Sequence, residues 1–287
     1  MQRFLIIGFG KLGSSLARFL KDDVHAVVRV ADPKPFDSSF KIVADQAEYS
    51  SALSKDIVNT ASFIFICTSD DQIPFVARQL QSFNLKNKFV VHTSGATGTG
   101  PLKGLHRQGA LVGSFHPLQT FNEMLLPAQH WYGIYATFQG DATILDALKS
   151  LFEPVGMKIV PVDSKQKQAV HLAAAVAANF QVALYSWADE ILKQAGLQTV
   201  SAGELFGPLA GQVAKNFAQK PLGQILSGPL QRGDLQTIGR HVQYLKDAGD
   251  QEGLGLYRML ARKLLQNADF PIKDREQLWK FLKGREK

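Results

Sequence analysis

The sequence predicts an α/β fold, with a doubly wound, mostly parallel sheet in the N-terminal half and an all-helical C-terminal domain. Apolar strand-like segments alternate with helix-like segments as far as residues 157–162, and a short third strand is expected at residues 40–44. From Asp163, which has the spacing of a capping pair with Gln166, only helical periodicity continues, divided by glycine and proline pairs. At 287 residues the chain is long enough for two domains. We therefore predict one domain over residues 1–163 and a second over residues 164–287.

A glycine-rich turn follows the first apolar segment, residues 4–7, and leads into a helix-like segment, residues 14–21. In such a βα unit the first glycine permits a tight turn, the second lets the backbone approach a pyrophosphate, and the third lets the helix pack close to the strand. The free N–H groups of the helix N-terminus hold the phosphate oxygens. A plain tight turn is the alternative, but a second apolar segment, residues 24–30, favours a dinucleotide site. Its predicted members are Gly8, Phe9, Gly10, Lys11, Leu12 and Gly13.

Further cofactor contacts are expected at the carboxyl ends of the strands, where ligands of open α/β sheets bind. Asp32 ends the second strand, where an acid typically binds the ribose hydroxyls of NAD and repels the 2′-phosphate of NADP. Lys34 is the candidate partner for that phosphate, and Arg29 is a second one. The predicted contacts at these strand ends are Asp32, Lys34, Thr68 and Ser69.

The composition bounds the kind of partner. The net charge is +7 and the pI about 9.4, but basic and acidic residues are interleaved, and the one locally basic stretch, residues 273–287, reads as an amphipathic helix. Nucleic acid is therefore not expected, whereas a small anionic ligand suits the positive surplus. Cys67 is the only cysteine, expected as a buried inert thiol, which favours a reducing, cytoplasmic compartment. The N-terminus enters its first strand at once, leaving no room for a signal peptide.

One uncharged run, residues 172–188, approaches the length that crosses a membrane. It contains Asn179, Gln181 and Ser186 and is rich in alanine. We therefore expect a buried helix and no membrane contact.

Two histidines and one asparagine are the candidate catalytic residues. His116 follows an apolar strand, where side chains reach the mouth of the sheet, and at its ordinary pKa of about 6.5 it can donate a proton at neutral pH. His171 and Asn179 lie on a long helix predicted over residues 164–195, where four-residue spacing through Ala175 places them on one face. Asn179 is costly to bury without partners, which favours a role in the site. Either histidine can be the proton donor, and the alternative for each is a structural side chain.

Two further segments are candidates for substrate contact. Ser94 and Gly95 follow the strand over residues 88–92. Later, Arg232 is suited to clamp a carboxylate with two hydrogen bonds, while Asp234 caps the next helix and orients the arginine. An ordinary loop ion pair between these two is the alternative. The predicted substrate-binding residues are Ser94, Gly95, Ser227, Arg232 and Asp234, and no metal site is predicted.

Several of these motifs stand in the order found in a known family. They are the glycine turn, His92-Thr93-Ser94-Gly95-Ala96, residues 113–121 with the pair His116-Pro117, residues 171–180, and residues 227–237 with His241. The chain resembles the Rossmann-like oxidoreductases whose helical C-terminal half is a domain of unknown function. The resemblance implies an NADP-dependent oxidoreductase related to 6-phosphogluconate-dehydrogenase-like enzymes and to pyrroline-carboxylate and ketopantoate reductases, forming a homodimer through the helical domain. The His116-Pro117 segment is also similar to a motif of prephenate dehydrogenases.

One position departs from this pattern. β-Hydroxyacid dehydrogenases and ketopantoate reductases have a catalytic lysine four residues before the asparagine, where this chain has Ala175, so a histidine must supply the proton. We expect a cytoplasmic NAD(P)H-dependent reductase of a small 2-oxo acid, with ketopantoate (2-dehydropantoate) as the leading substrate. The resemblance favours NADP as the cofactor and Asp32 favours NAD. The alternatives are an imine or prephenate-type oxidoreductase and, from another class, a noncatalytic NAD(P)-binding sensor.

Overall fold

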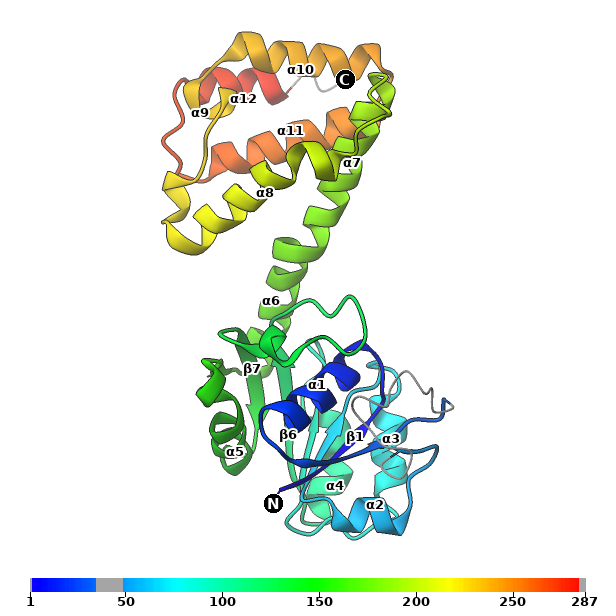
Figure 1. Cartoon of the computed structure of the whole chain (residues 1–287). Helices are drawn as coiled ribbons and strands as arrows, with labels where there is room; N and C mark the ends of the chain where they lie inside the picture. The colour runs from blue at the N-terminus through cyan, green and yellow to red at the C-terminus, as the bar shows by residue number, and fades with distance from the viewer. Residues whose placement is uncertain (1, 35–48, 284–287) are drawn as a thin grey trace. The chain divides into compact units, whose positions relative to one another are not determined.

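The computed structural model describes residues 2–34 and 49–283, and its contacts divide the chain into two compact units, Met1–Val176 and Ala177–Lys287 (Figure 1). The first unit holds every described strand, and the last of them, β8, ends at Pro161. The predicted boundary at residue 163 therefore marks the end of the sheet, whereas the contacts divide the chain after the first turns of the following helix. The strand expected at residues 40–44 lies outside the described residues.

The first unit is built on one sheet of eight strands in the order β3-β2-β1-β4-β5-β6-β7-β8. Every neighbouring pair is parallel except β6 and β7, so the predicted mostly parallel α/β sheet is confirmed. The order reverses between β1 and β4, and ligands of such sheets bind at this switch point. The strands are β1 (Arg3–Ile7), β2 (Val27–Ala31), β3 (Tyr49–Ser50), β4 (Phe63–Ile66), β5 (Phe89–His92), β6 (Leu111–Pro117), β7 (Tyr135–Gly140) and β8 (Lys158–Pro161).

Helices cover both faces of the sheet, because successive strand residues point to opposite sides and both sides are apolar. Phe4 and Ile6 of β1 belong to the core beneath α1 (Lys11–Asp22) and α5 (Ala142–Phe152). Leu5 and Ile7 belong to the core beneath three other helices. These are α2 (Lys55–Thr60), α3 (Ile73–Leu80) and α4 (Lys103–Arg107); short 3-10 turns lie at η3 (Gly100–Leu102), η4 (Ala128–Trp131) and η5 (Glu153–Val155).

A helix of 31 residues, Ser164–Gln194, follows the sheet. It consists of α6 (Ser164–Ala174), the π-helical turn η6 (Ala175–Asn179) and α7 (Phe180–Gln194), and it begins at the predicted capping pair of Asp163 and Gln166.

By length and composition alone, this helix is able to cross a membrane. The prediction that its apolar run is buried is wrong for the single chain, where Leu172 is 63% and Val182 66% exposed. An apolar composition indicates that a helix tends to be buried, but it does not indicate which surface buries it.

The second unit is all-helical within the described residues, as predicted. Its helices begin at side-chain caps that the sequence carries, among them Ser201 with Glu204, Asp234 and Asp250. A small core joins Ile238, Leu265, Leu278 and Leu282. The helices after α7 are α8 (Ala202–Gln219), η7 (Leu222–Gln224), α9 (Pro229–Arg232), α10 (Leu235–Asp247), α11 (Gln251–Gln266) and α12 (Arg275–Lys283).

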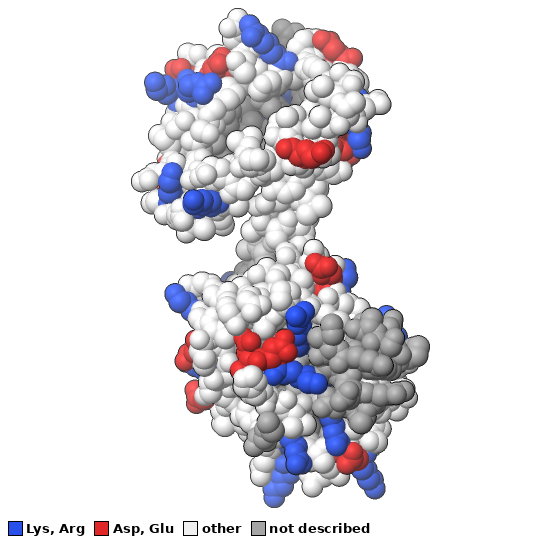
Figure 2. All heavy atoms as spheres, in the orientation of Figure 1, with Lys and Arg blue, Asp and Glu red and all other residues white. Residues whose placement is uncertain are grey.

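Charged side chains are dispersed over the visible face of each unit. Figure 2 shows Lys and Arg mixed with Asp and Glu, separated by broad uncharged areas. On α12, within the basic C-terminal stretch, Lys280 pairs with Glu276 at 3.1 Å, as expected for a solvated helix face.

Candidate active site

The glycine turn has the geometry that its spacing predicts. Gly8 has φ +95°, a conformation that favours glycine, and a Cβ on Gly13 would overlap the carbonyl oxygen of Gly8. Around Gly10, by contrast, a Cβ would meet no atom of the described residues within 4 Å, which leaves the backbone there room for a ligand. Gly10 is also the N-cap of α1, and no side chain caps the first turn. The N–H groups at this helix end are therefore available to an anion.

A cavity of about 660 Å³ lies against this turn at the carboxyl ends of the strands, within the size range of ligand pockets. Of the predicted cofactor residues, its lining includes Gly8, Gly10, Asp32, Lys34, Thr68 and Ser69. Thr68 Oγ1 is buried and has no hydrogen-bond partner among the described residues. Phe75 of α3 lines the cavity with its side chain half exposed, which offers an apolar surface to a ring. A dinucleotide fits this set, because the glycine backbone accommodates its pyrophosphate and the orphaned hydroxyl needs a partner.

Asp32 holds the glycine turn through hydrogen bonds to its carboxylate. Its Oδ2 accepts a hydrogen bond from Phe9 N at 2.6 Å, and its Oδ1 accepts one from Lys34 N at 2.9 Å. The carboxylate thus ties the turn to the end of β2. A carboxylate oxygen accepts more than one hydrogen bond, so this bracing is compatible with the predicted contact to a ribose.

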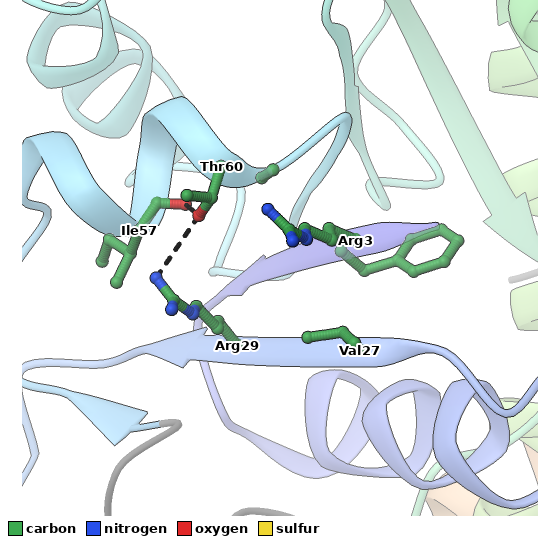
Figure 3. A pocket seen from close by; sticks show the side chains of 7 residues that line it. Arg3, Val27, Arg29, Ile57 and Thr60 are labelled. Atoms are coloured by element: carbon green, nitrogen blue, oxygen red, sulfur yellow. Dashed lines mark hydrogen bonds between the residues drawn. The ribbon is translucent and has the colours of Figure 1, made fainter. Parts of the chain in front are cut away.

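Arg29 is not placed to bind a 2′-phosphate, which corrects the second of the two predicted cation partners. Its Nη1 donates to Asp56 Oδ2 at 2.6 Å and to Thr60 Oγ1 at 3.3 Å on α2. Figure 3 shows this side chain in a separate pocket of about 190 Å³, which Arg3 and Val27 also line where β1 and β2 begin. The pattern of β2 did not reveal the direction of this side chain.

Cys67 lines the large cavity next to the glycine turn. Burial raises the pKa of its thiol to about 12, although a hydrogen bond with Thr93 acts in the opposite direction. A thiol with this pKa stays protonated at neutral pH, as the prediction of an inert cysteine requires.

His92, at the end of β5, holds the loop that follows it. Its Nδ1 accepts from Ser94 N at 3.3 Å, so its Nε2 carries the proton and donates to Gly98 O at 3.0 Å. The side chain is fully buried, and burial lowers its pKa to about 4. His92 is therefore a neutral, structural imidazole at pH 7.

Ser94 also serves this loop. Its hydroxyl donates to Asp70 Oδ2 at 2.7 Å and accepts from the backbone N–H groups of Ala96 and Thr97. The predicted contact of Ser94 with substrate stays a prediction, and the structure gives the hydroxyl an additional part, which is to fix the loop. Asp70, which anchors it, was missed in the sequence because it lies 24 positions from Ser94.

The two competing histidines meet over Gly95. Their ring centroids lie 5.6 Å apart, and a Cβ on Gly95 would stand 2.8 Å from His116 Nε2 and overlap His171 Nδ1. Glycine at this position therefore leaves the room in which both rings lie. The premise that His116 titrates near 6.5 is wrong, because burial, and after it the charges of Lys167 and His171, lower its pKa to about 4. At neutral pH its imidazole is uncharged and acts as a hydrogen-bonding group.

Lys167 is the residue in this cluster that the sequence reasoning missed. Its side chain on α6 is 1% exposed, and its Nζ has no hydrogen-bond partner among the described residues. Burial lowers its pKa to about 8, although the charge of Asp70 acts in the opposite direction. Two sequence signals were available: Lys167 stands one helical turn before His171, and a cation near a helix N-terminus opposes the helix dipole.

The other predicted site residues belong to the second unit. Asn179 ends η6 with an exposed side chain, so the argument from its burial does not hold, and the π turn departs from the α-helical spacing assumed for a shared face. Asp234 caps α10 as predicted, accepting from Thr237 N at 3.0 Å and Thr237 Oγ1 at 2.7 Å. The roles of Asn179, Ser227, Arg232 and Asp234 toward a substrate stay predictions.

Fold and site together define a class: a Rossmann-like α/β domain followed by a helical domain. The comparison with family models agrees, since residues 3–117 match the Rossmann-like domain and residues 134–264 match the domain of unknown function DUF2520. The chain therefore combines a Rossmann-like N-terminal domain with a DUF2520 C-terminal domain, and the resemblance drawn from its motifs is confirmed.

Solved structures share this fold over nearly the whole chain. BF3122 of Bacteroides fragilis, provisionally named an NADP oxidoreductase, is 24% identical with a TM-score of 0.69 and covers 93% of this chain and 98% of its own. An imine reductase of Streptomyces aurantiacus is 14% identical, with a TM-score of 0.60 and coverage of 98% and 99%. Prephenate dehydrogenase of Aquifex aeolicus is 17% identical, with a TM-score of 0.55 and coverage of 93% and 100%. The comparison with curated protein sequences gives no match.

Proposed function

We propose that the protein is an NAD(P)H-dependent oxidoreductase that reduces a small anionic substrate in the cytoplasm. The observation that carries this proposal is the cavity at the glycine turn, with its uncapped helix end and the orphaned Thr68 hydroxyl. The names of the solved structures that share the fold, an NADP oxidoreductase, an imine reductase and a prephenate dehydrogenase, support the same reaction class.

Each part of the site has a task in this reaction. The turn from Gly8 to Gly13 binds the pyrophosphate, and Asp32 and Lys34 receive the adenosine ribose. The reduced nicotinamide supplies a hydride. His116, as a neutral imidazole, hydrogen-bonds the substrate beside His171. The roles proposed from the sequence are that Asn179 orients the substrate and Arg232 holds its carboxylate, and the rate depends largely on the positioning of the reactants.

The leading substrate class is a small 2-oxo acid, with ketopantoate first among its members. A cyclic imine is the second candidate, because the chain shares its fold with an imine reductase. A noncatalytic dinucleotide sensor is the third, and Ala175 in the place of the family's lysine is the observation in its favour.

We expect the purified protein to oxidise NADPH or NADH when a substrate of the right class is added. Ketopantoate, other 2-oxo acids and cyclic imino acids are tested with the reduced cofactors, and prephenate with the oxidised ones, by absorbance of the reduced nicotinamide. If the protein binds a dinucleotide but turns over no member of the panel, the result would favour the noncatalytic sensor and contradict the enzyme proposal. Absence of dinucleotide binding would overturn both.

We also propose that the second unit forms a homodimer. On α8, Leu205, Leu209, Val213 and Phe217 recur at four-residue spacing, and each is at least half exposed. Beside this stripe a groove of about 350 Å³ runs between α7 and α8, lined by Tyr185, Phe206 and small residues. Soluble proteins rarely leave such contiguous apolar surface uncovered. A second copy of the chain covers it with the same apolar chemistry.

Light scattering coupled to size-exclusion chromatography should therefore give twice the mass of the chain. The substitutions Leu209→Glu and Phe217→Glu should yield a monomer with unchanged helical circular dichroism, because a charge in the stripe cannot be buried against the partner. Lys215→Glu, exposed on the same helix away from the stripe, is the matched control and should stay dimeric. A monomeric wild-type protein, or one that floats with lipid vesicles through this stripe, would refute the dimer.

A further inference from the structure

We propose that Lys167 is the catalytic proton donor of this reduction: its ammonium contacts the substrate atom that gains negative charge and delivers the proton to it. The inference rests on the proposed function and names the residue that carries its acid step. It replaces the two histidines as the candidate donor.

The first observation is an orphaned charge. Lys167 lies in the second turn of α6 with 1% of its surface exposed, and its Nζ has no partner among the described residues. Buried ammonium groups in stable proteins are paired, because an uncompensated charge loses its hydration. The Lys167 ammonium, left without a described partner at a cluster of strand-end side chains, therefore suits a ligand that supplies a hydrogen-bond acceptor.

The second observation concerns the groups around it. Asp70 follows β4, His92 ends β5, His116 lies in β6, and His171 stands one turn further along α6. The Asp70 carboxylate is engaged by the hydroxyls of Ser94 at 2.7 Å and Thr97 at 3.3 Å.

His92 and His116 are uncharged at neutral pH because burial lowers the pKa of each to about 4. Lys167 therefore brings a positive charge to a cluster whose one carboxylate already holds the loop.

The third observation is the pH range in which Lys167 loses its proton. Burial lowers the pKa of Lys167 to about 8, so the group is still protonated at pH 7 and releases its proton more readily than an exposed lysine. General acids work best when their pKa lies near the working pH. His116, with a pKa of about 4, has no second proton to give at pH 7.

For a carbonyl substrate, bound NAD(P)H would supply the hydride for the new C–H bond at the carbonyl carbon, and the π-electron pair of the C=O bond would move to the oxygen. The oxygen forms an O–H bond as one N–H bond of Lys167 breaks, and the neutral amine recovers a proton from solvent. For an imine, the substrate nitrogen takes the place of the oxygen.

The test compares Lys167→Met and Lys167→Arg with the wild type, and Lys165→Met, an exposed lysine of the same helix, is the matched control. We expect Lys167→Met to bind NADPH normally, to lose at least about 100-fold in kcat, and to lose the fall in kcat/KM above about pH 8. The Tm of Lys167→Met should not fall, because methionine fills the space without a charge. If Lys167 had a structural role instead, this substitution would lower the Tm. Arginine keeps the charge but does not release its proton, so activity restored by Lys167→Arg would overturn proton donation.

A second readout needs no turnover. In apo protein labelled with 13C at lysine Cε, one NMR resonance, absent from Lys167→Arg, should titrate near pH 8. A Lys167 that titrates with the other lysines overturns the proposal. A wild-type protein inactive on the whole panel fails the proposed function, and the donor role with it. An active wild type whose Lys167→Met variant keeps its rate and pH profile fails only the inference about Lys167.

Discussion

Substituting Gly13 by alanine will weaken dinucleotide binding about 100-fold or more and lower the stability of the first unit. A Cβ at this position would overlap the carbonyl oxygen of Gly8 and stand 3.1 Å from Cys67 Cβ. The atom in the way is backbone, so α1 must move away from β1, and overpacking of this kind costs about 1–3 kcal/mol or more. The same movement displaces the helix N-terminus that faces the phosphates. Titration with NADPH, followed by its fluorescence, should show affinity weakened by two orders of magnitude or more, about 3 kcal/mol.

Gly10→Ala is the matched control for this experiment. A Cβ there meets no atom within 4 Å in the part of the chain that the structure describes, so the variant should keep the wild-type Tm while its methyl group impedes the approach of the pyrophosphate. Gly255→Ala, on α11 and equally free of described neighbours, should leave NADPH binding unchanged and should not lower the Tm. If Gly13→Ala folds and binds NADPH as the wild type does, the assignment of the glycine turn to the cofactor is wrong.

Lowering the pH from 6.5 to 4 will destabilise the first unit, and His92 will account for about 3 kcal/mol of the loss. Burial lowers the pKa of His92 to about 4 from its ordinary 6.5, and the nearby charge of Lys167 acts in the same direction. Between these values the unfolded chain binds more protons than the folded one, so stability falls as the pH falls through this window. Protonation of Nδ1 would also set a donor against the N–H of Ser94, which that nitrogen accepts at 3.3 Å.

Urea unfolding at pH 7.5, 5.5 and 4.5 measures this effect in the wild type and in His92→Gln. Glutamine keeps an N–H group for the Gly98 carbonyl and does not titrate. The free energy of unfolding of the variant should therefore depend less on pH, by a slope that corresponds to at most one proton taken up on unfolding. His116 is half-buried and its pKa is also lowered, so a smaller dependence of stability on pH should remain in the variant. Identical pH dependence in the two proteins would show that His92 is not held neutral by the fold.

Much of the fold was predictable because its signals are local. The apolar run Phe63–Ile66 is buried on both faces, and such a continuous run marks a central strand of a parallel sheet. The capping pair of Asp163 and Gln166 placed the start of the long helix, because a cap and its partner lie three residues apart. The glycine turn was predictable for the same reason.

The site resisted prediction where its contacts join distant positions. Ser94 meets Asp70 across 24 positions, and His116 meets His171 because β6 and α6 are brought together by the sheet. Burial lowers the pKa of His116 and Lys167, and burial is a property of the packed molecule.

By itself, the sequence determined the alternation of strands and helices, the phosphate-binding glycine turn, the helix caps and the all-helical second half, since each depends on the spacing of neighbouring residues. Only the tertiary structure decided which charges are buried, which histidines are neutral and which ammonium has no partner among the described residues. Those properties depend on the surroundings of each side chain, and residues far apart in the sequence supply them when the sheet assembles.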